Sequence, residues 1–368
     1  MPSESAAFAF RTTMKTAVFY GGRDIRVEEV AVPVPGPGEV LVEVGAAGIC
    51  GSDLHRYRGH DPWGSIAAGP YRTGHELAGV VVALGPGVKG VAVGQRVGVE
   101  PTQLAGCGSC RSCRRGDYNL CPRKPRPEGR RRVSAGFSEL DLALAGNVFP
   151  LPDDVSFAVA SLVDVYACAV HAIHRAPVAD VVVVLGTGPV GQAVGQVARA
   201  LGGHQVVLVG RREQPLTLAR EVGAADLCID LSQTAELGEA VRELTRGEGA
   251  DLVFETVGGS GETVRQAVAA AGRGATVVVL GAFTGDVAVS YREANEKEIT
   301  LRWSSGYSSW RGEREYGIAL DLVAAGRIHA APLITHRFPL DRIGEAFAAA
   351  NDKRRSGATK VVVKPSSS

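Results

Sequence analysis

The second half of the chain alternates short apolar runs with stretches that have helical periodicity. The runs VVVVLG, QVVLVG, DLVFETVGG and ATVVVLGAF begin at residues 181, 205, 251 and 275. The stretches QAVGQVARALG and ETVRQAVAAAG, which lie between runs, are typical of helices. Because the runs are too continuously apolar for a sheet with one face in water, the pattern predicts an α/β fold with a doubly wound parallel sheet.

The first 150 residues have a different texture, in which short β-rich runs alternate with loops containing proline and glycine. Strands are predicted at 16–20, 40–44, 79–84 and 91–99. The apolar segment 155–174 predicts one or two helices. Beyond residue 300 the pattern is irregular, with a helix near 316–325 and a last strand at 360–363. This piece is too short to fold alone, so we expect it to rejoin the N-terminal domain.

A chain of 368 residues is long enough for two domains, at roughly 150 residues each. The changes in the hydrophobic pattern near residues 160 and 300 indicate where the domains begin and end. We expect a β-rich domain formed by residues 1–160 and 301–368, and a parallel-sheet domain formed by residues 161–300.

The net charge and the number of cysteines bear on the binding partners and the cellular compartment that we expect. Lys and Arg number 40 and Asp and Glu 39, a net charge of +1, which gives no general reason to bind nucleic acid or an anionic membrane. No apolar run approaches the roughly 20 residues of a membrane span, and the first residues lack the pattern of a secretory signal. Seven cysteines, an odd number, favour a reducing cytoplasm with thiols that are free or metal-bound.

A glycine fingerprint follows the first run of the parallel-sheet region. It reads Gly186-Thr187-Gly188-Pro189-Val190-Gly191, after a strand and at the start of a helix. Gly186 would make the tight turn, Gly188 would let the backbone approach a pyrophosphate, and Gly191 would let the helix pack on the strand. The alternative is a glycine-rich turn without a ligand. The flanking strand and helix favour a dinucleotide site.

The end of the second run bears on the choice of dinucleotide. In sites that prefer NAD an acidic residue stands there and binds the ribose hydroxyls. Here Gly210 occupies the position, and Arg211 and Arg212 follow. Two guanidinium groups without a carboxylate favour a 2′-phosphate, so we expect NADP(H). The alternative is a pair of solvated arginines.

Four cysteines stand close together in CGSCRSCRRGDYNLC. They are Cys107, Cys110, Cys113 and Cys121. Tetrahedral Zn²⁺ takes four thiolates, and a site closed in this way is structural. The alternatives are reduced core cysteines or disulfides, which the flanking Gly, Ser and Arg and the expected compartment disfavour. We expect a structural zinc lobe at about residues 100–125.

Two further segments carry metal-ligating residue types. Cys50 lies in GICGSDLH, and His75 and Glu76 lie in TGHELAG. Taken alone, these are an ordinary buried cysteine and a hydrogen-bonded histidine, and nothing in the spacing shows that they meet.

The motifs together carry a resemblance. GICGSDLH, TGHELAG, the four-cysteine lobe and GTGPVG occur in an order and at spacings that resemble the zinc-dependent medium-chain dehydrogenases/reductases, in the alcohol, polyol and threonine dehydrogenase branch. The resemblance covers about residues 14–364. It implies a GroES-like catalytic domain and a Rossmann domain, with Cys50 and His75 as ligands of a catalytic zinc. Glu76 matches a glutamate that ligates the metal or closely approaches it.

The resemblance also implies a further zinc ligand from the segment SLVDVYACAVHA. Asp164 falls on the position of that ligand, although Val165 replaces the proline of polyol members. Cys168 is the competitor, because simple alcohol dehydrogenases use a cysteine. Zinc accepts either donor, and the alignment favours Asp164. His171 and His174 stand three residues apart, and helix packing explains them better than a metal does.

The same resemblance implies roles for three residues of the segment that follows Cys50. Ser52 would touch the substrate oxygen, and His55 would relay a proton to solvent, for which a pKa of roughly 6.5 is suited. Asp53 would accept the other ring N–H of His75. The ordinary alternatives are a surface-loop histidine and a turn aspartate.

These features predict a zinc-dependent oxidoreductase that transfers hydride between NADP(H) and a secondary alcohol or ketone, such as a polyol, sugar or cyclitol. Alternatives are a carbonyl reductase, a threonine-dehydrogenase-like enzyme, and a non-enzymatic zinc and dinucleotide module. We expect one catalytic and one structural zinc and a homodimer or homotetramer, because the apolar run 275–283 would end the sheet. The basic run PRKPRPEGRRR is a solvated loop or, through Arg130, Arg131 or Arg132, a contact for an anionic substrate.

Overall fold

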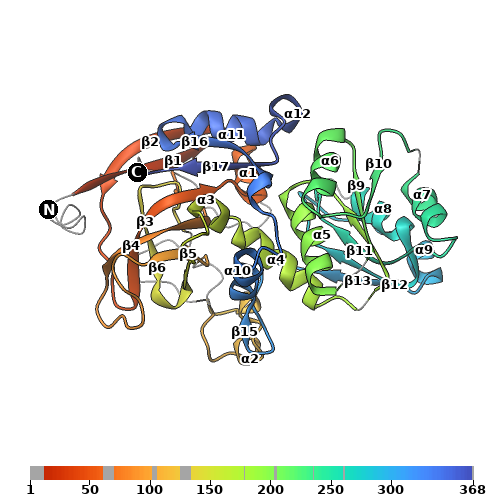
Figure 1. Cartoon of the computed structure of the whole chain (residues 1–368), viewed down its shortest axis with the longest axis horizontal. Helices are drawn as coiled ribbons and strands as arrows, with labels where there is room; N and C mark the ends of the chain where they lie inside the picture. The colour runs from red at the N-terminus through yellow and green to blue at the C-terminus, as the bar shows by residue number, and fades with distance from the viewer. Residues whose placement is uncertain are drawn as a thin grey trace. The chain divides into compact units, whose positions relative to one another are not determined.

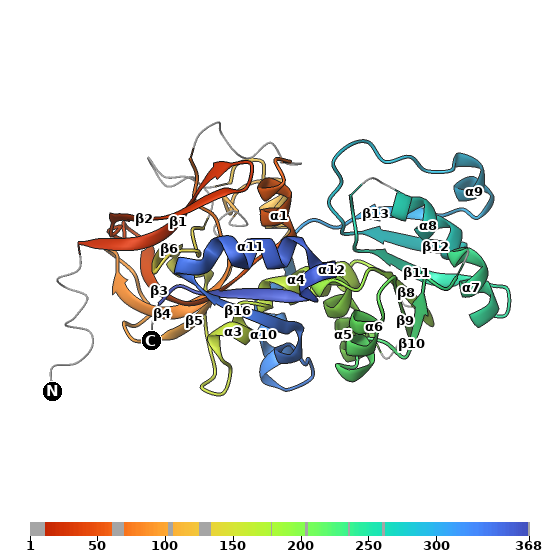
Figure 2. The same ribbon diagram turned by 90° about the horizontal axis from the view of Figure 1, so that it is seen from above.

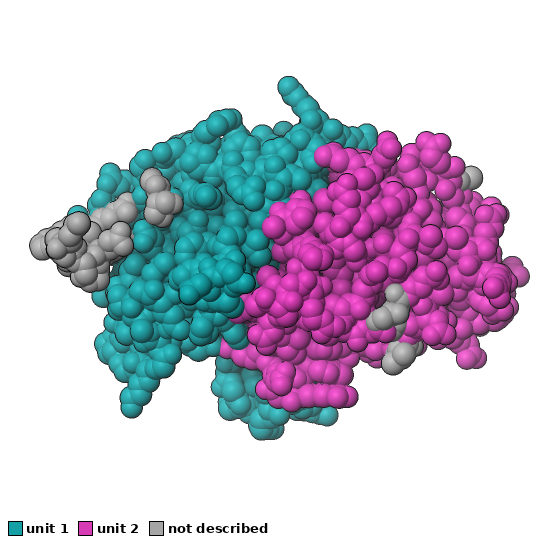
Figure 3. All heavy atoms as spheres, in the orientation of Figure 1, with its two compact units in different colours: residues 1–164, 334–368 teal, residues 165–333 magenta. Residues whose placement is uncertain are grey.

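The computed structural model describes residues 12–60, 70–101, 106–124, 134–177, 179–202, 205–234, 236–259 and 262–366. The chain divides into two compact units, coloured separately in Figure 3. Unit 1 comprises residues 1–164 and 334–368, and unit 2 comprises residues 165–333. The helix α4 (Val163–His174) contains the division.

Unit 1 is built on a largely antiparallel sheet with the strand order β16-β17-β3-β4-β5-β7, in which β6 also pairs with β3. Its strands are β3 (Glu39–Gly48), β4 (Glu76–Leu84), β5 (Arg96–Val99), β6 (Leu140–Leu144), β7 (Val148–Pro150), β16 (Ile334–Pro339) and β17 (Lys360–Lys364). β17 pairs with β3 through Val362 and Gly48, so the end of the chain does rejoin the N-terminal domain, as predicted.

Two outer strands and several short helices complete unit 1 (Figures 1 and 2). They are the hairpin β1 (Thr13–Gly21) and β2 (Asp24–Ala31), with α1 (Gly51–Tyr57), α2 (Arg111–Arg114), α3 (Phe157–Ala160), α11 (Ile343–Asn351) and α12 (Lys353–Ser356). α11 packs against β2, β16 and β17, where Phe347 meets Phe19 and Phe137 in the core. This core fixes the ends of β3 and β4, from which the metal-ligating residue types project.

Unit 2 contains a parallel sheet with the strand order β10-β9-β8-β11-β12-β13. Its strands are β8 (Val181–Leu185), β9 (Gln205–Gly210), β10 (Leu227–Asp230), β11 (Ala250–Glu255), β12 (Ala271–Val279) and β13 (Thr300–Trp303). The order reverses between β8 and β11, which is the switch point where doubly wound sheets bind ligands. The predicted Rossmann-type fold is confirmed.

Helices cover both faces of this sheet, with α5 and α6 on one side and α7 and α8 on the other (Figure 2). The helices of unit 2 after α4 are α5 (Pro189–Gly202), α6 (Glu213–Glu221), α7 (Leu237–Leu244), α8 (Glu262–Ala270), α9 (Tyr291–Glu296) and α10 (Glu315–Ala324). A short hairpin, β14 (Ser309–Trp310) and β15 (Glu313–Arg314), precedes α10. Because both faces are covered, most residues of the inner strands β8, β9, β11 and β12 are buried.

Two sequence predictions about unit 2 were wrong. The segment 301–333 belongs to this unit and not to the β-rich domain, because Thr300–Trp303 adds β13 to the parallel sheet. For the same reason the run 275–283 does not end the sheet: β12 pairs with β11 on one side and with β13 on the other. The signal was weak, since β13 has four residues and three of them are exposed.

The segment Phe157–His174 is long and apolar enough to be a candidate membrane span. However, 72% of it is buried inside the protein, and it is divided between α3 and α4. Burial of this kind is typical of a core helix.

Candidate metal and cofactor sites

The four cysteines of the predicted zinc lobe converge in unit 1. The sulfur atoms of Cys107, Cys110, Cys113 and Cys121 all lie within 4.8 Å of one another. The sulfur of Cys110 lies 3.4 Å from that of Cys113 and 3.8 Å from that of Cys121, so the thiols are free and not disulfide-bonded. This is the donor set of a closed tetrahedral zinc site.

The environment of these sulfurs favours a cation. Hydrogen bonds from the side chain and backbone of Ser109 lower the pKa of Cys107 to about 5, and the backbone N–H of Cys113 lowers the pKa of Cys110. Burial and the neighbouring sulfurs raise the pKa of Cys113 to about 12. Four thiolates at this separation need a positive ion among them, which Zn²⁺ supplies.

A hydrogen bond that the sequence did not reveal anchors the lobe. Tyr118, which lies between the third and fourth cysteines, donates its hydroxyl to Glu100 Oε1 at 2.7 Å. Glu100 is fully buried and follows β5, so the lobe is tied to the sheet of unit 1.

The second candidate metal site lies at the ends of β3 and β4. Cys50 follows β3 and immediately precedes α1, while His75 and Glu76 stand at the start of β4. Gly48 and Glu76 face each other in the antiparallel register. The pairing brings one ligand atom each of Cys50, His75 and Glu76 within 4.8 Å of one another. The fold therefore brings Cys50 close to His75 and Glu76, which the spacing of these residues in the sequence could not show.

The electrostatics of His75 show a strongly negative site. Burial by itself lowers the pKa of His75, but the Cys50 sulfur, its hydrogen bond, and the charges of Asp53 and Asp164 raise it to about 10. The groups that hold a proton on the imidazole would equally hold a divalent cation. A thiolate, an imidazole and a carboxylate are donors that zinc accepts, so the residues fit a catalytic zinc.

The prediction that Asp53 accepts a ring N–H of His75 was wrong, although the two side chains are neighbours. One carboxylate oxygen lies 4.0 Å from His75 Nδ1, which is an ion-pair distance and not a hydrogen bond. The carboxylate accepts the backbone N–H of Cys50 at 3.0 Å and the hydroxyl of Thr73 at 3.0 Å. Asp53 thus fixes the backbone of Cys50, and its charge helps to raise the pKa of His75.

Glu76 has a partner that sequence reasoning missed. Lys360 of β17 donates its ammonium group to Glu76 Oε2 and to the carbonyl of Ile49, the latter at 3.0 Å. Both charged side chains are only 1% exposed. The lysine therefore holds Oε2 of a glutamate whose carboxylate also lies close to Cys50 and His75.

The predicted further ligand stands in the first turn of α4. Asp164 is buried and its charge acts on His75, although it lies outside the closest set formed by Cys50, His75 and Glu76. Cys168 is half-buried and also lies outside that set.

The two residues expected to handle the proton lie on α1. The hydroxyl of Ser52 is buried and finds no hydrogen-bond partner among the residues that the structure describes. Such an orphaned donor is suited to a bound ligand. Burial and the charges of Arg58 and His60 lower the pKa of His55.

The glycine fingerprint of unit 2 has the geometry of a phosphate-binding turn. Gly186 has a φ of +113°, and its N–H donates to the carbonyl of Val209 at 2.9 Å. A side-chain carbon on Gly191 would lie 1.9 Å from the carbonyl oxygen of Gly186, so only glycine lets the helix approach. A carbon on Gly188 would meet nothing within 4 Å. This open backbone at the start of α5 fits a pyrophosphate.

Comparisons with known proteins identify the family of this chain. Residues 36–153 match the alcohol dehydrogenase GroES-like domain, and residues 189–325 match the zinc-binding dehydrogenase domain. The chain is 35% identical to an L-threonine 3-dehydrogenase of Pyrococcus furiosus over 355 residues, which are 95% of this chain and 97% of that protein. The chain belongs to the zinc-dependent medium-chain dehydrogenases/reductases. It is therefore an oxidoreductase that acts on CH–OH groups.

Other members of the family show how varied its substrates and cofactors are. A sorbitol dehydrogenase of Halalkalibacterium halodurans is 33% identical over 94% of this chain and 97% of its own length. A putative zinc-binding dehydrogenase from Sinorhizobium meliloti, bound to NADP, superposes with a TM-score of 0.82 at 30% identity, over 96% of this chain and all of that chain. A short chain alcohol dehydrogenase from Escherichia coli CFT073, in complex with NADH, gives 0.84 at 29% identity, with the same coverage.

Within this dehydrogenase, two buried glutamates were not found from the sequence. Glu255 ends β11 and accepts the N–H groups of Val257 and Gly258, each at 2.8 Å, next to the glycine turn. Glu315 accepts from His171 at 2.6 Å and from His174 at 3.3 Å. The histidines predicted to pack in a helix therefore share a buried carboxylate. An irregular sequence pattern around residue 315 gave no signal for it.

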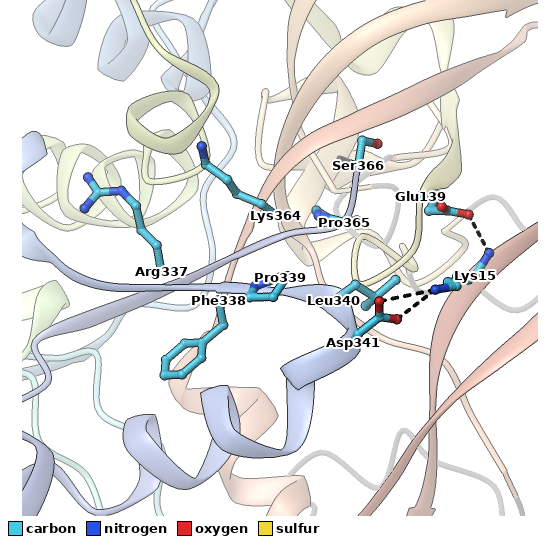
Figure 4. Close-up of a pocket in the computed structure, with 10 residues that line it drawn as sticks. All are labelled: Lys15, Glu139, Arg337, Phe338, Pro339, Leu340, Asp341, Lys364, Pro365 and Ser366. Atoms are coloured by element: carbon cyan, nitrogen blue, oxygen red, sulfur yellow. Dashed lines mark hydrogen bonds and ion pairs between the residues drawn. The ribbon is translucent and has the colours of Figure 1, made fainter. Parts of the chain in front are cut away.

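A pocket of about 500 Å³ lies beside β16 and β17 (Figure 4). At one end Lys15 forms an ion pair with Asp341 at 3.0 Å, and both side chains are more than half exposed. None of the predicted ligands lines the pocket, whose walls are Lys15, Glu139, Arg337, Phe338, Pro339, Leu340, Asp341, Lys364, Pro365 and Ser366. Arg130, Arg131 and Arg132 lie outside the described residues.

Proposed function

We propose that this dehydrogenase uses NADP(H) to oxidise a secondary alcohol of a polyol, sugar or cyclitol. The observation that supports the cofactor assignment is the sequence at the end of β9. Gly210 carries no carboxylate, and exposed Arg211 and half-buried Arg212 follow it before α6 begins. A 2′-phosphate meets no repulsion at Gly210 and finds two guanidinium groups next to it.

An acidic residue of the neighbouring strand also lies at this edge. Asp230 ends β10 in register with Gly210. One of its oxygens already accepts the N–H of Ser232 at 2.8 Å, which closes a turn. We therefore assign Asp230 to the turn and not to ribose recognition.

A catalytic zinc would be held by Cys50, His75 and a carboxylate, for which Glu76 and Asp164 are the candidates. When bound, the metal lowers the pKa of the alcohol, and the nicotinamide accepts the hydride. Lys360 holds the Glu76 carboxylate in place, and Asp53 orients the backbone of Cys50. The second zinc would be held by the four-cysteine lobe.

The chain's own groups then handle the proton. The buried Ser52 hydroxyl accepts the proton of the alcohol in exchange for its own, and His55 passes it outward. Because the pKa of His55 is lowered, the imidazole is predominantly neutral at pH 7 and ready to accept a proton.

The substrate class is supported by relatives named for sorbitol and L-threonine. A threonine-dehydrogenase-like activity is the second candidate, since the relative at 35% identity bears that name. The same site would also serve a carbonyl reductase running in the opposite direction. A panel of polyols, sugars, cyclitols and L-threonine, assayed with NADP⁺, separates the first two. Absence of turnover on every alcohol and ketone would favour a non-enzymatic module.

We also propose a cytoplasmic homo-oligomer. The parallel sheet ends in β10 on one side and in β13 on the other, and Trp303 of β13 is 57% exposed. Pairing of two β13 edges about a two-fold axis would cover this ring. Light scattering at micromolar concentration is expected to give a dimer or tetramer, and a monomer would refute the proposal.

The cofactor is tested by kcat/KM for NADP⁺ and NAD⁺ with the same alcohol. We expect a preference for NADP⁺ of about 10-fold or more, since a charged hydrogen bond contributes roughly 1.5–3 kcal/mol. The double variant R211S/R212S is expected to lose most of it. R220S, which removes an exposed arginine at the other end of α6, is the matched control. A native enzyme that prefers NAD⁺ contradicts the assignment.

A further inference from the structure

Thr187 and Gly210 lie side by side at the carboxyl edge of the sheet in unit 2. β8 and β9 are neighbours, with Leu185 opposite Val209, so the residues that follow them are adjacent. A side-chain carbon placed on Gly210 would lie 2.4 Å from Cγ2 and 3.2 Å from Oγ1 of Thr187. It would also lie 3.2 Å from Cδ2 of Leu216, on α6.

These distances leave no room for any side chain at position 210. Carbon atoms in contact prefer a separation of about 3.5–4.0 Å, and 2.4 Å is strongly repulsive. Thr187 is 8% exposed and β-branched, so it has few rotamers and little freedom to move aside. Several glycines of the described residues have a positive φ, but Gly210 is not one of them. Glycine is therefore required at 210 for space and not for backbone conformation.

We propose that Thr187 is a residue that determines cofactor specificity, through its contact with position 210. Its side chain fills the space in which an acidic residue would have to start, so the carboxylate that recognises ribose hydroxyls cannot be accommodated. Position 210 therefore places no negative charge beside Arg211 and Arg212. The inference rests on the proposed preference for NADP(H), and adds that Thr187 and not Gly210 alone maintains it.

A double-mutant cycle tests the coupling. The proteins are the native enzyme, T187A, G210D and T187A/G210D, as zinc-loaded full chains. The measurements are the melting temperature and the Kd of NADP⁺ and NAD⁺ in binary complexes, followed by protein fluorescence. G210D is expected to melt lower by about 5 °C or more, because overpacking a rigid site is destabilising. T187A/G210D is expected to recover most of that loss.

The cofactor measurement gives the second prediction. In T187A/G210D the ratio of the two Kd values is expected to move toward NAD⁺ by about 10-fold or more, because the new carboxylate repels the 2′-phosphate and accepts from the ribose. T187V/G210D is the matched control. Valine has the shape of threonine and keeps the obstruction, so this protein is expected to remain as unstable as G210D.

Several outcomes would overturn the proposal. It is wrong if G210D is as stable as the native protein, if T187A does not rescue it, or if T187V rescues it equally well. Should G210D not fold, G210A and T187A/G210A repeat the stability cycle with a single added carbon. A native enzyme that binds NAD⁺ more tightly would refute the proposed cofactor preference, while the melting temperatures would still report the steric coupling.

Discussion

Lys360 and Glu76 form a buried ion pair between β17 and the start of β4. Both side chains are 1% exposed, and the two residues are 284 positions apart in the chain. The pair places a fixed positive charge behind a carboxylate that also faces Cys50 and His75. It thereby links the last strand of unit 1 to the candidate metal site.

Removal of one partner of this pair is expected to be costly. K360M would leave the Glu76 carboxylate buried without its counter-ion, and we expect a loss of roughly 3–5 kcal/mol in the free energy of unfolding. Denaturant titration measures it. The double variant E76Q/K360M is expected to recover part of the loss, and a K360M protein as stable as the native chain would contradict the prediction.

Cys107 tests the structural lobe. C107S removes one of four clustered sulfurs, so we expect zinc content to fall from two ions per chain to about one, with a lower yield of folded protein. Metal analysis of the purified protein measures this. C228S, which changes a half-buried cysteine outside both clusters, is the control. Two zinc ions retained in C107S would show that the lobe is not a zinc site.

Cys50 tests the catalytic site. C50S is expected to abolish turnover with every alcohol while the melting temperature stays near the native value, because we assign Cys50 to the catalytic zinc and not to the core. Activity and circular dichroism, measured on the same preparation, separate chemistry from folding. Near-native activity in C50S would show that the catalytic assignment is wrong.

The lowered pKa of Glu315 leads us to expect that the stability of the protein depends on pH. Burial alone raises the pKa of Glu315, but His171, His174 and the backbone N–H of Ser308 lower it to about 2, from an ordinary value of 4.5. Because the folded-state pKa is the lower one, the contribution is fully present above about pH 4.5. It is lost as the pH falls toward 2.

The comparison of native protein and E315Q isolates this contribution. We expect E315Q to be less stable at pH 7 and the difference in free energy of unfolding to shrink as the pH falls below about 4.5. Loss of zinc in acid affects both proteins alike and cancels in the difference. Two stability curves that run parallel from pH 6 to pH 3 would contradict the prediction.

Local features of the sequence determined much of this protein. The continuous apolar runs required a sheet covered on both faces, and Gly186 and Gly191 predicted the turn that the structure forms. The four cysteines fall within 15 residues, so their convergence needed only local chain geometry. Such patterns suffice because strand burial and tight turns are settled by neighbouring residues.

Tertiary structure decided the contacts between distant segments. The register of β3 and β4 brings Cys50 to His75 and Glu76, and β17 delivers Lys360 to the same point. Glu315 reaches His171 across 144 residues, and β13 joins the parallel sheet although its own pattern is largely exposed. No local periodicity encodes these pairings, because each depends on the register and order of strands that only the packed core fixes.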